Sequence, residues 1–250
     1  MKRNYFNITL KITAAIIAAL MLSLSACNDD DDDDDDDDDN GTPSSNVLEG
    51  NTGTMTLKSD KTYTLDGFVY VGDGETLTIE AGTMIQGNPG GGENASALVV
   101  TRGGKIIAEG TSTDPIIFTA NGDTKEGAYP LYANGLWGGV IILGKATHNE
   151  PVDAMAIEGI PDDVGFDNKW GGTDDADNSG TFKYVQIRHG GTDIGAGNEI
   201  NGLTMGGVGS GTTISYVEVL SNRDDAFEWF GGAAQCDHLI ASYCGDDSYD

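Results

Sequence analysis

The sequence predicts an all-β solenoid, a ribbon of short strands that coils around its own core, and three observations favour it. A shift of 22 residues places Tyr216–Leu220 on His238–Ser242. The strand-like segments are short, and none keeps a helical spacing of apolar residues. The 37 glycines against 6 prolines are typical of frequent tight turns. A repeat of this size indicates coils that bury their apolar faces on their neighbours.

The same 22-residue shift aligns further residues. Downstream it pairs Asp224-Asp225 with Asp246-Asp247, Phe227 with Tyr249, and Glu228 with Asp250. Upstream it pairs Met84-Ile85 with Ile106-Ile107, and Thr76–Thr78 with Leu98–Val100. We therefore predict a parallel β-helix with rungs of about 22 residues, in which the paired residues are neighbours.

The segments before this repeat support the same fold. Apolar strands are predicted over Thr62–Val71, Thr76–Ile79 and Met84-Ile85, and again over Leu98–Val100, Ile106–Ala108 and Ile116–Thr119. The glycine-rich stretch Asn88–Asn94 is predicted to be a loop that leaves the regular coil. A sandwich of hairpins would need repeated two-residue turns, and few are visible.

The N-terminus predicts export. Lys2 and Arg3 precede the apolar run Ile12–Leu24, which is too short to span a bilayer as a mature helix. The following Leu24-Ser25-Ala26-Cys27 resembles a bacterial lipobox. We expect residues 1–26 to be a lipoprotein signal peptide and Cys27 to carry lipid, which would anchor the chain in a membrane. The alternative is an ordinary signal peptide followed by an incidental cysteine.

Eleven consecutive aspartates, Asp29–Asp39, follow the cysteine. Such a run repels itself and is extended. Its position resembles the signal that sends Bacteroidota lipoproteins to the outer face of the outer membrane. We therefore expect residues 27–46 to be lipid anchor, export signal and linker, and residues 47–250 to form the β-helix domain outside the cell.

The charge excludes one class of partner. The formal net charge is −28, and beyond the aspartate run thirty acidic residues still face ten basic ones. A surface of this sign repels phosphate backbones. We expect no nucleic-acid partner.

Several motifs together resemble a known family. They are Gly135–Gly144, Gly172–Gly180, Val185–Gly191, Asn198–Thr204 and Gly245–Asp250. The set is similar to Bacteroidota surface lipoproteins with a right-handed parallel β-helix, within the wider pectate-lyase-like group. The resemblance implies fold and location more than activity. Members of that family usually continue past this point, so we expect a C-terminally truncated copy of a longer β-helix.

Two places are candidates for calcium. Asp175, Asp177 and Ser179 alternate before Gly180, like the first half of a calcium loop, but Gln186 stands where the last acidic ligand belongs. The alternative is a polar loop capped by its own side chains. The stacked twin aspartates, including Asp225 and Asp247, are the second place, because like charges one rung apart need a cation or an arginine such as Arg223. The alternative is that the carboxylates of these twin aspartates point into solvent and bind no cation.

Clustered carboxylates also suggest sugar hydrolysis or elimination. The candidate catalytic residues are Asp224, Asp225, Asp246, Asp247, Arg188 and His189. The full local motifs of β-helix polygalacturonases and pectate lyases are missing, and His189 also fits a purely structural role. We expect binding rather than catalysis.

The overall expectation is an outer-membrane surface lipoprotein whose β-helix binds an extracellular ligand, most plausibly a glycan, with structural calcium. The alternatives are a polysaccharide lyase or hydrolase and a structural adhesin or partner in a surface complex. Trp137, Trp170, Trp229 and Phe230 would stack on sugars if exposed and otherwise form core. A disulfide between Cys236 and Cys244 requires the chain to fold back at a corner.

Overall fold

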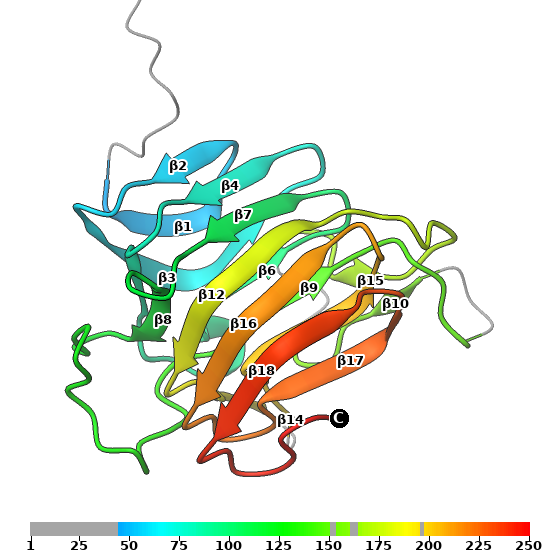
Figure 1. Cartoon of the computed structure of the whole chain (residues 1–250). Coiled ribbons are helices and arrows are strands. Elements are labelled where there is room, and N and C mark those ends of the chain that lie inside the picture. The colour runs from blue at the N-terminus through cyan, green and yellow to red at the C-terminus, as the bar shows by residue number, and fades with distance from the viewer. Residues whose placement is uncertain (1–44, 151–153, 161–164, 196–197) are drawn as a thin grey trace, which may run out of the picture. The chain divides into compact units, whose positions relative to one another are not determined.

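A computed structural model describes residues 45–250, except residues 151–153, 161–164 and 196–197. The predicted signal peptide, the lipid-bearing Cys27 and the aspartate run lie outside the described residues. The described strands form three parallel ladders, here called faces A, B and C, around one core (Figure 1). This arrangement confirms the predicted all-β parallel β-helix.

Each face collects strands from successive coils. Face A contains β2 (Met55–Leu57), β4 (Thr76–Ile79), β7 (Lys105–Glu109) and the first halves of β12 (Gly180–Arg188), β16 (Thr213–Leu220) and β18 (Cys236–Ser242). Face B contains the first half of β3 (Thr62–Val71), β5 (Met84–Gly87), β8 (Ile116–Ala120) and the second halves of β12, β16 and β18. Face C contains the second half of β3, β6 (Ala97–Val100), β9 (Val140–Leu143), β15 (Leu203–Val208) and β17 (Phe227–Gly232).

A few elements lie outside this scheme. The first strand, β1 (Val47–Asn51), pairs with both halves of β3. Two small antiparallel pairs occur in corner loops: β10 (Met155–Ala156) with β11 (Lys169–Trp170), and β13 (Asp193–Gly195) with β14 (Asn198–Glu199). A 3-10 turn, η1, spans Gly92–Asn94. Within the described residues, no helix is long and apolar enough to cross a membrane.

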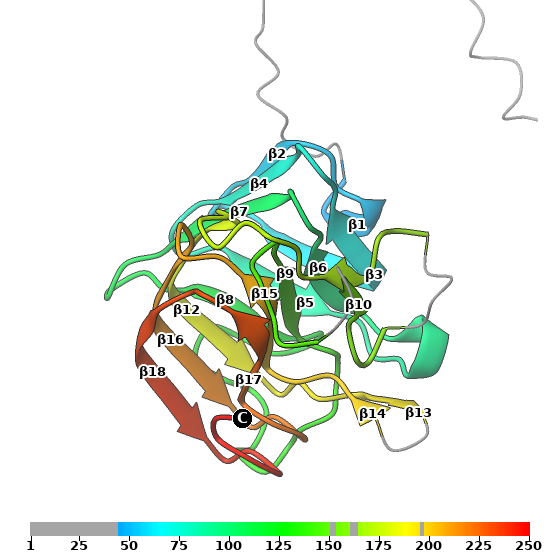
Figure 2. The same ribbon diagram turned by 90° about the vertical axis from the view of Figure 1, so that its right-hand side faces the viewer.

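The long strands bend where one face passes into the next. β12, β16 and β18, which lie side by side in Figure 2, bend at Tyr184, Tyr216 and His238, with φ of 50°, 56° and 51°. These left-handed angles crowd any residue that carries a Cβ. The three rings stack, with centroids 4.5 Å apart between the tyrosines and 4.1 Å between Tyr216 and His238. Ring stacking therefore offsets the backbone strain at a corner that sequence reasoning did not predict.

The repeat is regular only in part of the chain. In the last coils, Val217 pairs with Leu239 and Phe227 with Tyr249, which confirms the predicted 22-residue register. The predicted upstream pairs are wrong: Met84 pairs with Ile117, and Leu77 pairs with Ile106. Before that point a spacing of 22 residues does occur, between Thr62 and Met84. The loop that contains η1 lengthens its coil, so strands that look one rung apart in sequence belong to different faces.

Two hydrophobic clusters organise the domain. The larger fills the coil and includes Val140 and Ile142 of β9. The alternating residues Ile141 and Leu143 point the other way and belong to a second cluster with Ile157, Ile160 and Trp170. The long corner loop after β9 therefore packs on the outside of face C, so that face C is covered on both sides there.

Candidate acidic site

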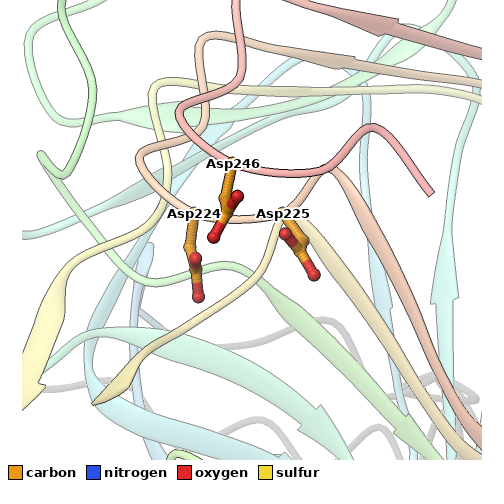
Figure 3. Close-up of side chains that lie close together, drawn as sticks. All are labelled: Asp224, Asp225 and Asp246. Atoms are coloured by element: carbon orange, nitrogen blue, oxygen red, sulfur yellow. The ribbon is translucent and has the colours of Figure 1, made fainter. Parts of the chain in front are cut away.

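The repeat brings the predicted aspartates together at the corner that leads into face C. Asp224 and Asp225 precede β17, and Asp246 occupies the corresponding corner one coil later. Carboxylate oxygens of these three residues lie within 4.8 Å of one another. Figure 3 shows the three side chains next to one another, projecting in the same general direction.

A second group shares one member with the first. Oxygens of Asp225, Glu228 and Asp250 also lie within 4.8 Å of one another. Glu228 is on β17, and Asp250 is 22 residues later, one coil further along the helix. Asp225, with 8% of its surface exposed, joins the two groups into one set of five carboxylates, here called the acidic cluster. Asp224 and Glu228 are half-buried, and Asp246 and Asp250 are exposed.

Burial and crowding disfavour the charged forms. Burial, together with the charges of Asp225 and Glu199, raises the pKa of Asp224 to about 6. Burial, together with the charges of Glu158 and Asp225, raises the pKa of Glu228 to about 8. The pKa of Asp225 is also raised, chiefly by burial. At neutral pH Glu228 is therefore mainly protonated, and a cation between the carboxyls would offset the cost of charging the cluster.

Two buried amides lie beside the cluster. Asn201 Nδ2 donates to Glu228 Oε2. Asn222 Nδ2 donates to the carbonyl of Asp225 at 2.7 Å. Among the described residues, the Oδ1 atoms of Asn201 and Asn222 are the buried side-chain polar atoms without a hydrogen-bond partner. A buried oxygen without a donor is costly, and at Asn201 it belongs to the same amide that contacts a cluster carboxylate.

Asp247 and Arg223 do not take the positions that the sequence suggested. The backbone N–H of Asp247 donates to Asp225 Oδ1 at 2.8 Å, so Asp247 supports the cluster through its main chain. Its carboxylate belongs to neither group of three. Arg223 Nη2 lies 3.6 Å from Glu199 Oε1, an ion pair at the edge of the corner. The predicted stacking therefore holds for Asp224 and Asp246, whereas Asp225 meets the backbone of Asp247.

Arg188 and His189 serve a neighbouring loop. Arg188 Nη1 lies 3.8 Å from the fully buried carboxylate of Asp123 and 3.2 Å from the carbonyl of Lys125. Burial acts to raise the pKa of Asp123, but hydrogen bonds from Thr119 and Ala128 lower it below its ordinary value. The buried His189 lies with Nδ1 2.6 Å from the Ala133 carbonyl. Both candidate catalytic residues therefore hold the loop after β8 in place.

Asp175, Asp177 and Ser179 cap their own loop. Asp175 Oδ1 accepts hydrogen bonds from the Thr147 N–H at 2.9 Å and hydroxyl at 2.6 Å, which lower its pKa. Asp177 Oδ2 accepts from the N–H of Lys145 at 3.1 Å and from the buried Ser179 hydroxyl at 3.5 Å. These contacts fit the alternative interpretation, in which a polar loop is capped by its own side chains. Calcium in this loop stays a prediction.

The aromatic and sulfur residues have structural positions. Trp137 and Trp170 are buried in the two clusters, so neither is available to stack on a sugar. Trp229 and Phe230 are half-buried and pack against those clusters. Cys236 and Cys244 are free thiols, and burial raises the pKa of both.

Sequence reasoning missed three members of the site. Glu228 and Asp250 were aligned by the 22-residue shift, so a signal for them existed, but they were not selected as ligands. Asn201 comes from the preceding coil, where Thr204 pairs with Glu228 at a spacing of 24 residues. The 22-residue shift does not detect that spacing.

Comparison with known families matches residues 49–250 to the pectate-lyase like beta helix domain. Because the match covers most of the chain and the structure has the corresponding architecture, the protein belongs to this family. Searches of curated proteins and of solved structures gave no match.

The raised pKa values predict an unusual pH dependence of stability. In the unfolded chain, Asp224 and Glu228 titrate near 3.8 and 4.5, but in the fold near 6 and 8. Between these values the folded chain binds more protons, so its stability decreases as pH rises. Without divalent cations, we expect the melting temperature to fall by several degrees between about pH 4 and about pH 8.

Glu228→Gln should make that decrease smaller, because glutamine is neutral throughout. Asp60→Asn, which removes a charge of the same sign from an exposed turn, is the matched control and should keep the wild-type slope. Scanning calorimetry in a chelating buffer gives the curves. Equal slopes for Glu228→Gln and Asp60→Asn would contradict the assignment.

Proposed function

We propose that this chain is a surface lipoprotein whose β-helix binds an extracellular glycan and holds calcium in the acidic cluster. The single observation that carries the proposal is the set of five carboxylates at the corner before β17. Hard oxygen ligands, several of them charged, are what calcium prefers. Family membership supports a carbohydrate-related role, since the domain is of the pectate-lyase like type.

The cluster is suited to a cation for three reasons. Two triads of carboxylates meet at Asp225, so a cation between them would neutralise several charges at once. The amide of Asn201 already contacts Glu228, and rotation by half a turn would aim its free Oδ1 at the same space. The raised pKa of Glu228 indicates that no positive group compensates the charged form of this carboxyl. A bound cation would supply that compensation.

Calcium binding tests the proposal directly. At neutral pH we expect calorimetry to detect calcium binding by the described domain. Asp225→Asn and Glu228→Gln should each weaken it by about tenfold or more, because each removes a charged ligand. Asp175→Asn should leave the affinity unchanged. Loss of binding in Asp175→Asn but not in Glu228→Gln would locate calcium in the other loop and refute this assignment.

The anchor can be tested separately. Cys27→Ala should abolish incorporation of radiolabelled palmitate in cells and release the protein from the outer-membrane fraction, since the proposed lipid would be carried by this thiol. Protease added to intact cells should degrade the wild-type domain if it faces outward. Unchanged labelling and fractionation of Cys27→Ala would contradict lipid anchoring.

A second function is favoured by one observation. Glu228, with a pKa of about 8, would carry a proton at neutral pH beside the exposed Asp250. Glycoside hydrolysis uses a protonated carboxyl together with a second carboxyl group across the scissile bond. The alternative hypothesis is therefore that the protein is a polysaccharide hydrolase or lyase that uses the same cluster.

Mass spectrometry of polysaccharides incubated with the protein and calcium separates the two functions. Binding without catalysis predicts that a panel of plant, algal and bacterial polysaccharides is recovered intact. Shortened chains, or chains that end in an unsaturated sugar, would establish an enzyme. Loss of those products in Glu228→Gln, with an unchanged melting temperature, would identify the cluster as its active site.

A further inference from the structure

We propose that a pocket at the corner from face C to face A is a binding site for an uncharged sugar. The inference rests on the proposed glycan-binding function and specifies where the glycan binds and which kind it is. The pocket has a volume of about 530 Å³, within the range of small-molecule sites. Its walls include Tyr70, Asp73, Arg102, Lys145, Phe166 and Asp167.

The pocket is built by three successive coils and one loop. Asp73, Arg102 and Lys145 directly follow β3, β6 and β9, so parallel stacking brings them to one edge of face C. Phe166, Asp167 and residues 171–174 of the long loop after β9 complete the lining. One side of the pocket is thus fixed by the coil itself.

An aromatic surface lines part of the pocket. The rings of Tyr70 and Phe166 have centroids 4.8 Å apart, and Phe68 meets Phe166 edge to face at 6.3 Å. Tyr70 and Phe166 are half-buried, so part of each ring remains open to the pocket. The electron-rich face of such a ring attracts the C–H groups of a sugar ring.

Fixed polar groups also line the pocket. Arg102 donates from Nη2 to Asp167 Oδ2 at 2.6 Å and from Nη1 to the Gly171 carbonyl at 3.2 Å. Lys145 Nζ lies 3.4 Å from Asp73 Oδ1. A guanidinium held in this way loses little freedom when it binds a ligand, and its remaining N–H groups can donate to hydroxyls.

Gly103 leaves room for the second ion pair. It adopts φ +86°, and a Cβ at this position would lie 1.7 Å from Asp73 Oδ1 and 2.6 Å from Lys145 Nζ. Any larger residue would displace both groups. Because a sugar hydroxyl donates and accepts at once, adjacent hydroxyls can bond to a carboxylate and an ammonium together.

The charges favour a neutral ligand. Asp73, Asp167 and Asp174 outnumber Arg102 and Lys145 among the lining residues. The chain around them is itself strongly acidic. A uronic acid would bring its carboxylate into this negative field and compete with aspartates already paired to the two cations. A neutral sugar avoids both costs, so the pocket should prefer it over a polyuronate.

The pocket and the acidic cluster can be altered independently. The pocket lies where strands of face C end, whereas the cluster lies where the face C strand β17 begins. Substitutions in the pocket should therefore leave calcium binding intact.

The experiment is a calorimetric titration of the calcium-loaded domain with neutral tetrasaccharides of glucose, mannose, galactose and xylose, and with tetragalacturonate. We expect at least one neutral tetrasaccharide to bind more tightly than tetragalacturonate. Phe166→Leu keeps an apolar side chain but removes the ring, and the Asp73→Ala/Lys145→Ala variant removes the exposed polar pair. Each should weaken binding of that neutral sugar by about tenfold or more.

Lys58→Ala is the matched control, because Lys58 forms a comparable exposed ion pair with Glu80 at 2.9 Å, outside the pocket. It should bind sugar like the wild type, and all variants should bind calcium like the wild type. Wild-type sugar affinity in both pocket variants, or tighter binding of tetragalacturonate, would overturn the pocket proposal alone. A calcium-loaded wild type that binds none of these sugars would refute the proposed glycan binding and the pocket with it.

Discussion

The parallel hydrogen bonding between successive coils is the constraint on which the rest of the structure depends. Each coil must place its strands over those of the previous coil, so residues at equivalent positions are stacked at the spacing of neighbouring strands, about 4.8 Å. Apolar residues benefit, and the inner core continues along faces A, B and C. The same pairing determines which corner residues become neighbours. At one corner this produces the stacked rings of Tyr184, Tyr216 and His238, whose contact offsets a strained backbone. Insertions are tolerated only where strands are not paired, and this is why the long loops lie at corners.

The same constraint produces the acidic cluster. Stacking places Asp246 over the corner that holds Asp224 and Asp225, and Asp250 over Glu228, although like charges repel. The repulsion and the partial burial appear as raised pKa values at Asp224, Asp225 and Glu228. A fold that only needed a polar corner could use serine or asparagine there without this cost. The presence of five carboxylates here, Asp225 included, is therefore the main reason to assign a cation to this corner. The pocket proposed to bind sugar also depends on this stacking. Its lining combines residues from three coils of face C with residues of an inserted loop.

Much of the fold could be predicted from the sequence, because burial inside a narrow coil forces short alternating strands and a repeat. The last coils follow the 22-residue repeat, and the twin aspartates were located by it. The predicted upstream pairs were wrong, since the loop around η1 lengthens its coil while leaving the strand patterns alike. Arg188 and His189 stand at the end of a strand, as active-site residues would. Nothing in the sequence around them shows that Asp123 and Ala133 come from a distant loop to contact them. The pocket around Arg102 left no sequence signal, because its residues recur at no constant spacing.

The central claim is that the acidic cluster around Asp225 holds a calcium ion. The most direct measurement is a crystal structure of the domain grown with calcium, with diffraction data recorded at a wavelength where calcium scatters anomalously. We expect an anomalous peak between Asp225, Glu228 and Asp250, with the Asn201 amide turned so that its Oδ1 faces the ion. Ordered water in that space with no anomalous peak, or a peak only beside Asp175 and Asp177, would contradict it.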